Sequence, residues 1–259
     1  CRCTGYAGII RAVEKSIEAY NKSEKTNNHY NRLIEARFIP EYFLDIHKQL
    51  KQIPQQQPKK KQTEFLVGGG TDLYVQRWEE LVQTESQFIS NRNVSSEIKI
   101  ENGKIVIGGA ATIQQILESK IFKKYFPSLA SQLELFGSLP IRNRATVAGN
   151  IVNASPIGDL SNILLSLDAT VHLTGKSQRV LPLRKFYLGY KTLAKKKMEI
   201  IEKITFTIPP KHFLFNFEKI SKLTYLDIAS VNTSIALVAK NGKIESAGIS
   251  AGGVAPIPL

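Results

Sequence analysis

The chain has 259 residues, of which 42% are hydrophobic, enough for a sizeable core in one large domain or two smaller ones. No apolar run approaches the roughly 18 residues that a membrane span needs, and no basic-then-apolar leader opens the sequence, which argues against a membrane span and a secretory signal. The formal net charge of +13 is compatible with a nucleic acid, an acidic membrane surface or an acidic ligand, but the lysines are scattered, which favours a lysine-rich background.

The first predicted elements are helical. Apolar residues recur at helical spacing over residues 8–20, and this periodicity is lost between residues 21 and 31. We therefore expect a helix, then a linker, with a domain boundary near residue 30. A short helix over 43–50 is followed by a low-complexity loop over 52–62.

The middle of the chain mixes strands and helices. Residues 64–67 are expected to form a strand that leads into three glycines and a helix from Asp72. Alternating apolar residues on both sides of Asn102-Gly103 predict a hairpin. Helices are expected over 112–117 and 129–136.

The last part of the chain is predicted to contain mostly strands. Residues 137–159 are rich in Gly, Asn, Pro and Ser and show little periodicity, so an irregular segment is expected before a helix over 160–167. The lysines at 195–197, like those at 59–61, fall where loops are expected, and charge runs are usually solvated there. Strands are predicted at 169–173, 200–208, 213–220 and 228–239, with a last hairpin that turns at Asn241-Gly242 and runs to 249. Because no regular βαβ repeat is present, the predicted class is α+β.

The glycine-rich segment from Leu66 to Leu73 is the first candidate site. Glycines allow a positive φ and a close approach of the backbone to a ligand, and successive N–H groups can form a nest for an anion. The segment lacks the spacing of a Rossmann fingerprint and the Lys-Ser/Thr of a P-loop. By itself it indicates either a tight turn or a phosphate site.

The irregular segment is the second candidate site. Its apolar residues argue against disorder, and Asn150, Ser155 and Asp159 offer short polar groups beside small residues, which suits recognition of a polar ligand. For Asp159 the alternative is an N-cap for the helix that follows.

The sequence opens on Cys1-Arg2-Cys3, and the chain has no further cysteine. This pair could supply half the thiolates of a [2Fe–2S] cluster, or it could bind zinc, whereas the spacing is poor for a disulfide. The scarcity of cysteine suits a reducing compartment. The histidines follow no carboxylate pattern, so they are expected to be surface or packing residues: His29, His47, His172 and His212.

These segments resemble the molybdenum hydroxylase family. Residues 1–6 resemble the end of its second iron–sulfur domain, residues 68–72 its FAD pyrophosphate loop, and residues 146–159 its second FAD motif. Two further segments are similar to the xanthine dehydrogenase branch, Lys219-Ile220-Ser221-Lys222 and Asp227-Ile228-Ala229 with Val231, and Tyr190-Lys191-Thr192 points the same way.

The resemblance implies a two-lobed FAD-binding domain of the vanillyl-alcohol-oxidase-like (PCMH) type, preceded by the last helix of a [2Fe–2S] helical domain. Residues 1–30 would be the end of the [2Fe–2S] domain with a linker. Residues 31–259 would be the FAD-binding domain, with lobes at 36–110 and 111–259 and the start of a C-terminal domain at its end. The sequence is thus expected to be a fragment cut at both ends.

The resemblance also implies the site residues. Cys1 and Cys3 would be metal ligands, no catalytic acid or base is expected, and Phe136 would lie beside the flavin. The cofactor-binding residues would be Leu66, Val67, Gly68, Gly69, Gly70, Thr71, Asp72, Leu73, Phe136, Thr146, Asn150, Ser155, Asp159, Ile201 and Lys219.

The implied function is electron transfer in a cytoplasmic hetero-oligomer. Electrons would pass from a molybdenum cofactor on a large partner subunit through [2Fe–2S] clusters to FAD and then to NAD. Aldehyde, carbon monoxide, nicotinate or aromatic thioester substrates remain alternatives to xanthine. Leu223 to Leu226 replace a denser group of charges that relatives often carry, which leaves the choice between NAD and oxygen open. A basic nucleic-acid-binding module is the remote alternative, and no membrane partner is expected.

Overall fold

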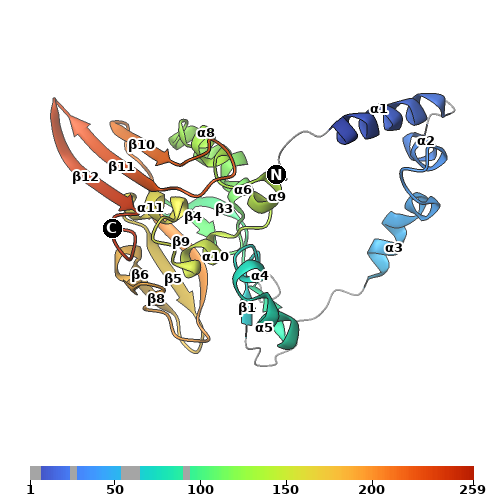
Figure 1. Cartoon of the computed structure of the whole chain (residues 1–259). Helices are drawn as coiled ribbons and strands as arrows, with labels where there is room; N and C mark the ends of the chain where they lie inside the picture. The colour runs from blue at the N-terminus through green and yellow to red at the C-terminus, as the bar shows by residue number, and fades with distance from the viewer. Residues whose placement is uncertain (1–6, 24–27, 54–64, 90–93) are drawn as a thin grey trace. The chain divides into compact units, whose positions relative to one another are not determined.

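The computed structural model describes residues 7–23, 28–53, 65–89 and 94–259. These residues belong to two compact units, Cys1–Gln57 and Pro58–Leu259 (Figure 1). The sequence predicted a boundary near residue 30, whereas the compact units divide after Gln57.

The first unit consists of helical segments with exposed side chains. α1 confirms the helix expected over residues 8–20, and its apolar stripe is exposed, with Ile9 56% accessible. α2 begins inside the stretch predicted as a linker, because the side chain of Asn28 accepts a hydrogen bond from the N–H of Tyr30 at 3.0 Å and caps the helix. The elements are α1 (Ala7–Lys22), α2 (His29–Glu35), the 3-10 helix η1 (Glu41–Leu44) and α3 (Ile46–Gln52).

Two antiparallel sheets dominate the second unit (Figure 1). The larger has the order β3-β4-β9-β5-β6 and the smaller the order β10-β11-β12. Short parallel pairing joins β1 (Phe65–Val67) to β2 (Ser86–Phe88), and β7 pairs with β8. The remaining strands are β3 (Ile98–Glu101), β4 (Lys104–Gly108), β5 (Thr170–Thr174), β6 (Arg179–Pro182), β7 (Tyr187–Gly189), β8 (Thr192–Leu193), β9 (Ile200–Thr207), β10 (Phe213–Ile220), β11 (Val231–Lys240) and β12 (Lys243–Gly252).

The predicted hairpins at Asn102-Gly103 and Asn241-Gly242 are both present. All four residues have a positive φ, from 50° to 72°, as the tight turns between paired strands require. β4 of the first hairpin pairs with β9. The five-stranded sheet therefore contains strands from both sides of residue 110, the position at which the resemblance implied a boundary between two lobes.

Helices fill the connections between strands in the second unit. α6 begins with a capping box, in which the Thr112 side chain and the Gln115 side chain satisfy each other's backbone N–H groups. The helices are α4 (Leu73–Gln76), α5 (Trp78–Gln83), α6 (Ile113–Glu118), α7 (Lys120–Tyr125), α8 (Leu129–Glu134), α9 (Leu139–Arg142), α10 (Val147–Asn153) and α11 (Asp159–Ser166), with the 3-10 helix η3 (Leu183–Lys185).

The expectation that residues 137–159 are irregular is wrong in part, because α9 and α10 lie within them. The sequence of α10 contains Gly, Asn and two Val, which are poor helix formers. Burial of Val147, Ala148 and Ile151 and a cap by Thr146 hold it as a helix nevertheless.

α11 packs against β11 and β12, and α10 contacts both α11 and β9. The two helices therefore connect the smaller sheet to the larger one within this unit. The hydrophobic core lies around them and includes fully buried side chains from each layer, among them Ile107, Ile151, Ile163 and Ile204. This arrangement confirms the predicted α+β class.

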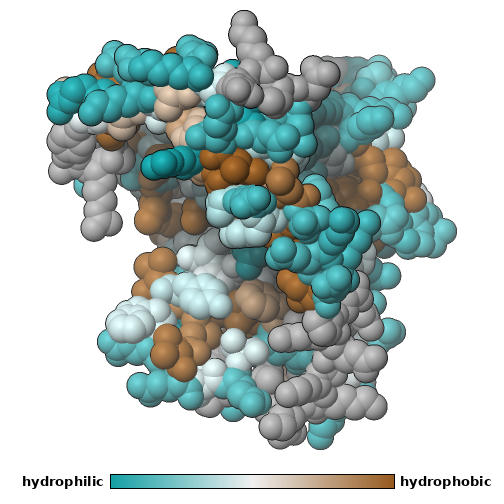
Figure 2. All heavy atoms as spheres, turned by 90° about the vertical axis from the view of Figure 1, so that its right-hand side faces the viewer, coloured by the Kyte–Doolittle hydropathy of each residue, from teal (hydrophilic) through white to brown (hydrophobic). Residues whose placement is uncertain are grey.

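No helix in the described residues is long and apolar enough to cross a membrane. On the face drawn in Figure 2, hydrophobic side chains lie in several separate patches among hydrophilic ones.

Candidate functional site

The glycine-rich segment is held in place by close backbone packing. A Cβ atom on Gly69 would overlap the carbonyl oxygen of Arg144, and one on Gly68 would overlap the hydroxyl of Thr146. Gly70 adopts φ +79°. Gly68 and Gly69 are therefore required because neighbouring protein atoms leave no room for a side chain, and Gly70 is required because of its positive φ. These are the requirements of a tight turn.

The same segment presents unused hydrogen-bond donors. Within the described residues, none of the backbone N–H groups from Gly69 to Asp72 donates to another protein group. All of these residues line a single cavity. Four successive N–H groups at a cavity wall are a suitable nest for an anion such as a phosphate.

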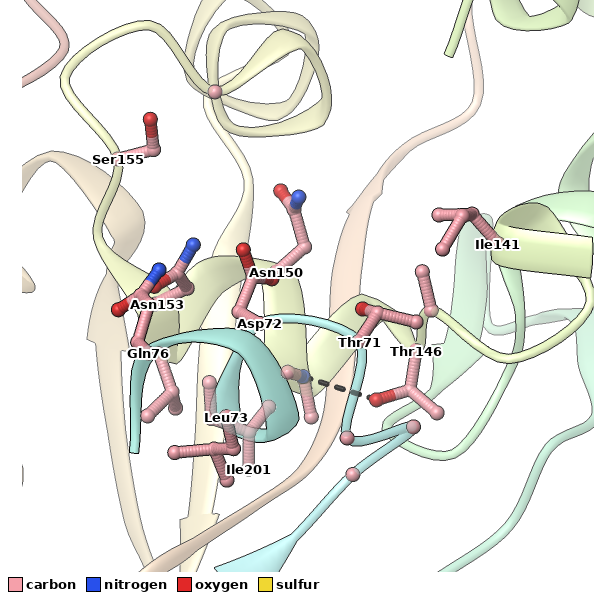
Figure 3. Close-up of a pocket in the computed structure, with 18 of the residues that line it drawn as sticks. Thr71, Asp72, Leu73, Gln76, Ile141, Thr146, Asn150, Asn153, Ser155 and Ile201 are labelled. Atoms are coloured by element: carbon pink, nitrogen blue, oxygen red, sulfur yellow. Dashed lines mark hydrogen bonds between the residues drawn. The ribbon is translucent and has the colours of Figure 1, made fainter. Parts of the chain in front are cut away.

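The second predicted segment forms the adjacent wall. The Thr146 hydroxyl accepts the N–H of Gly149 at 3.1 Å, as the dashed line in Figure 3 shows. Asn150 follows on α10, and its side-chain oxygen is buried without a hydrogen-bond partner in the described part of the chain. Because an unsatisfied buried acceptor costs about 1–3 kcal/mol, this atom fits a site whose ligand supplies a donor.

Charged groups meet beside these two walls. Burial raises the pKa of Asp72, while the positive charge of Lys191 and a hydrogen bond to Asn153 act against this shift. The Lys191 ammonium donates to the side-chain oxygen of Asn153 at 3.0 Å and to its carbonyl oxygen. Lys191 itself has φ +54°, a strained conformation for a non-glycine residue.

Asp159 does not cap α11, because Gly158 is the N-cap residue and Asp159 is the first residue of the helix. Its carboxylate accepts from the Lys219 ammonium at 2.8 Å and from the Asn232 amide at 2.6 Å. The Lys219 ammonium also donates to the carbonyl oxygen of Leu135 at 3.1 Å. The side chains of Asp159 and Lys219 are only 10% and 5% exposed, so they form a buried ion pair at the cavity wall.

Further polar side chains support this pair. Asn232 also donates to the carbonyl oxygen of Ile157 at 3.1 Å and accepts from the Asn162 amide. Ser250 donates to Asn162 at 2.6 Å. The network connects α11 with β11 and β12, so it fixes the position of Asp159 through several satisfied hydrogen bonds.

The cavity has a volume of about 980 Å³, which is at the upper end of the range for ligand sites. Of the fifteen residues predicted to bind the cofactor, it is lined by all but Val67. Val67 is fully buried in a small core with Leu81 under the glycine loop. Figure 3 shows Leu73, Gln76 and Asn153 on the same side of the drawn site as Ile201, with Ile141 on the other side.

The sequence missed several lining residues. They come from α4, α9, α10, the β7–β8 turn, the segment before β9 and the loop before β11, and include Gln76, Ile141, Asn153, Lys191, Lys195, Lys197, Met198, Glu199 and Ile228. The segments Tyr190-Lys191-Thr192 and Asp227-Ile228-Ala229 carried a sequence signal, and Ile141 and Asn153 lie within the irregular segment over 137–159 that the sequence singled out. Gln76 of α4 and the residues directly before β9 carried no such signal, because only the tertiary fold brings these segments to one cavity.

The predicted metal ligands Cys1 and Cys3 lie outside the described residues. Among the residues that are described, no group of three or more His, Cys, Asp or Glu side chains could hold a metal ion.

Comparison with protein families gives one match over most of the chain. Residues 25–210 match the model of the "FAD binding domain in molybdopterin dehydrogenase".

Curated relatives include the xanthine dehydrogenase FAD-binding subunit of Escherichia coli O157:H7, 25% identical over 202 residues, which are 75% of this chain and 68% of the relative. Nicotinate hydroxylase hnxS of Emericella nidulans is 33% identical over 135 residues, half of this chain. The chain spans only 10% of that relative's length.

Among solved structures, carbon monoxide dehydrogenase from Hydrogenophaga pseudoflava matches with a TM-score of 0.70 and 24% identity, over 76% of this chain and 69% of that chain. Quinoline 2-oxidoreductase from Pseudomonas putida 86 matches with a TM-score of 0.67 and 21% identity, over 75% and 68%. These likenesses confirm the predicted α+β fold of the PCMH type.

Proposed function

Because the chain belongs to the family of FAD-binding domains in molybdopterin dehydrogenases, we propose that its cavity binds one FAD and relays electrons from [2Fe–2S] clusters to NAD in a molybdenum hydroxylase of the xanthine dehydrogenase type. The observation that carries the binding proposal is the row of free N–H groups from Gly69 to Asp72 at the cavity wall. These groups would donate to the two phosphates of FAD.

Other residues would orient the cofactor. The unpaired oxygen of Asn150 would accept a hydrogen bond from it, and the Asp72 carboxylate would accept one from a hydroxyl group. The Asp159–Lys219 ion pair would hold the Lys219 side chain in place at the cavity wall. Ile141 and Ile201 would exclude water from the apolar parts of the ligand. Bound FAD would supply the redox chemistry, for which the chain supplies binding, orientation and electrostatics.

The proposed partners follow from the family and from the names of the relatives. The xanthine dehydrogenase relative is an FAD-binding subunit, which supports a hetero-oligomer with a large subunit that carries the molybdenum cofactor. Cys1 and Cys3 would contribute to a [2Fe–2S] cluster. The low cysteine count supports a cytoplasmic location.

A second candidate is a nicotinate-oxidising enzyme, which the 33% identity to a nicotinate hydroxylase supports. The assembly recovered through a tag on this chain can be assayed with xanthine and with nicotinate. Oxidation of nicotinate without oxidation of xanthine would overturn the xanthine dehydrogenase assignment.

Titration of the flavin-free chain with FAD tests the binding proposal. We expect quenching or enhancement of flavin fluorescence that saturates at one FAD per chain. Asn150→Leu should weaken FAD binding about ten-fold, which corresponds to the free energy of about one hydrogen bond. Asn143→Leu is the matched control, because Asn143 is exposed and does not line the cavity. A folded chain that binds no FAD would overturn the proposal.

The acceptor needs a separate test. The FAD-loaded chain, reduced by light with EDTA as the electron donor and without oxygen, should be reoxidised rapidly on mixing with NAD, which takes up the two electrons as NADH. Reoxidation by oxygen alone would overturn the assignment of NAD as the acceptor.

A further inference from the structure

The lysines at 195–197 lie in a part of the chain that the sequence predicted to be a solvated loop, but two of them line the cavity. Lys195 and Lys197 belong to the connection between β8 and β9, and Lys191 of the β7–β8 turn lines the same cavity. Cationic side chains at a ligand cavity favour an anionic ligand.

The connection is held by a buried carboxylate. Glu199 is 4% exposed and accepts from Arg179 Nη1 of β6 at 2.9 Å on both carboxylate oxygens. It also accepts the backbone N–H of Lys196 at 2.8 Å. Burial alone would raise the pKa of Glu199, but these hydrogen bonds and the charges of Arg179 and Lys196 lower it overall. An ionised, fully bonded Glu199 therefore fixes the backbone of this connection.

Lys195 strengthens the same connection. Its ammonium donates to the carbonyl oxygens of Lys196 and Lys197 at 3.0 and 3.2 Å. The Lys195 side chain is thereby used within the loop, and the turn at Lys197-Met198 is held directly before β9.

Lys197 differs from the other lysines at the cavity. Lys219 pairs with Asp159, Lys191 is bonded to Asn153, and Lys195 is bonded to its own loop. In the described part of the chain, the ammonium of Lys197 has no hydrogen-bond or ion-pair partner. It is exposed at the wall of a cavity whose glycine loop also has free donors.

The lysine-bearing connection and the glycine loop are linked through α10. Lys191, four residues before Lys195, is bonded to Asn153 at the end of α10, and Asn153 is in turn bonded to Asp72 of the glycine loop. Figure 3 shows Asn153 and Asp72 on the side of the site where Ile201 of β9 lies. The cation and the N–H groups therefore belong to connected walls of one site.

We propose that Lys197, held by the Arg179–Glu199 pair, binds the diphosphate of the bound dinucleotide and makes the cavity select ligands that carry a diphosphate. This inference rests on the proposed binding of FAD. It assigns Lys197 a role in specificity, because a charge–charge contact strengthens binding of FAD but not of a flavin without phosphate.

The test compares three probes on the full chain: FAD, ADP and riboflavin. Lys197→Gln should weaken FAD and ADP binding about five-fold, as loss of one partly screened charge pair near 4 Å predicts, and Lys197→Glu should weaken both further. Riboflavin binding should stay within about two-fold of that of the parent chain, because no phosphate is involved. Lys243→Gln is the matched control, since Lys243 is exposed in the β11–β12 hairpin and does not line the cavity.

One further measurement, the salt dependence of binding, keeps the outcomes separate. Added salt should weaken FAD binding less in Lys197→Gln than in the parent chain. If the parent chain binds FAD and both Lys197 variants bind FAD and ADP as the parent does, the inference is overturned while the proposed function stands. An equal loss for riboflavin and FAD would also overturn it, since that pattern reports a distorted cavity. If the parent chain binds no FAD, the proposed function itself fails.

Discussion

At the scale of single residues, the Asp159–Lys219 ion pair shows most clearly that each buried charge needs its partner. The ammonium and carboxylate are both buried, and the pair is completed by Asn232 and the carbonyl oxygen of Leu135. Such a pair contributes little net free energy, but removal of one partner leaves a buried charge without compensation.

Lys219→Met should therefore lower the free energy of unfolding by about 3–5 kcal/mol in urea denaturation. The double variant Lys219→Met/Asp159→Asn should recover much of this loss, because no charge is then left buried. Lys211→Met, at an exposed position outside the cavity, should stay within about 0.5 kcal/mol of the parent. Equal effects at Lys219 and Lys211 would contradict the importance of the pair.

Asp72 should give the molecule an unusual pH dependence. Burial raises the pKa of this carboxyl group in the folded chain, so the folded state binds the proton more tightly than the unfolded state. Its contribution to stability is therefore present at low pH and is lost as pH rises from its unfolded pKa through its raised folded pKa. Asp72→Asn should have a higher Tm than the parent at neutral pH while it binds FAD less tightly.

Asp227 should show the opposite dependence of Tm on pH, because its pKa is lowered in the folded chain. Hydrogen bonds led by the backbone N–H of Leu223 lower the pKa of Asp227, so its stabilising contribution is present at neutral pH and is lost as pH falls. Asp227→Asn should thus lower Tm at neutral pH. If Asp72→Asn lowers Tm at neutral pH, as Asp227→Asn should, the pKa shift of Asp72 has the wrong sign.

At the scale of elements, the glycine loop and α10 act as one structure. The loop lies so close to Arg144 and Thr146 that side chains on Gly68 or Gly69 have no room. The loop keeps its N–H groups free for a ligand, whereas those of Val147 to Asn150 at the start of α10 are used by Ala111, Gly109 and Thr146. Within the described residues, the free N–H donors therefore belong to the loop and not to the N-terminus of α10.

Gly69→Ala should displace this loop. We expect a loss of about 1–3 kcal/mol in stability from the overlap and at least a ten-fold weaker binding of FAD. Gly189→Ala is the control, since its added Cβ atom would meet only ordinary contact with Thr192. Flavin binding by Gly69→Ala that equals the control would show that the loop does not hold the phosphates.

At the scale of the whole molecule, the site is built where two sheets meet through α10 and α11. Its walls come from residues more than one hundred positions apart, and several of its polar groups have no partner among the described residues. A ligand that satisfies these groups should stabilise the second compact unit as a whole.

FAD at one hundred times its dissociation constant should stabilise the fold by about 2.7 kcal/mol, which corresponds to a rise in Tm of about 5–11 °C for a unit of this size. Hydrogen exchange should slow over residues 68–73 and 146–159. Exchange in α1, which belongs to the other compact unit, should stay unchanged and serves as the internal control. Slower exchange in α1 alone would contradict the location of the site.

The sequence by itself determined the elements with strong local signals. Alternating apolar residues around Asn-Gly turns specified both hairpins, and helical spacing specified α1 and α11, because period and turn chemistry act over a few neighbouring residues. The resemblance also identified the family, and fourteen of the fifteen residues that it predicted to bind the cofactor line the cavity.

Only the tertiary structure decided the rest. α10 is a helix because its apolar residues are buried, although its propensity is poor. Asp159 pairs with Lys219 of a distant strand instead of capping its own helix, and two of the three lysines in the loop before β9 line the cavity. These outcomes depend on which strands pair and which helices pack between them, and contacts between residues far apart in the chain leave no periodic signal in the sequence.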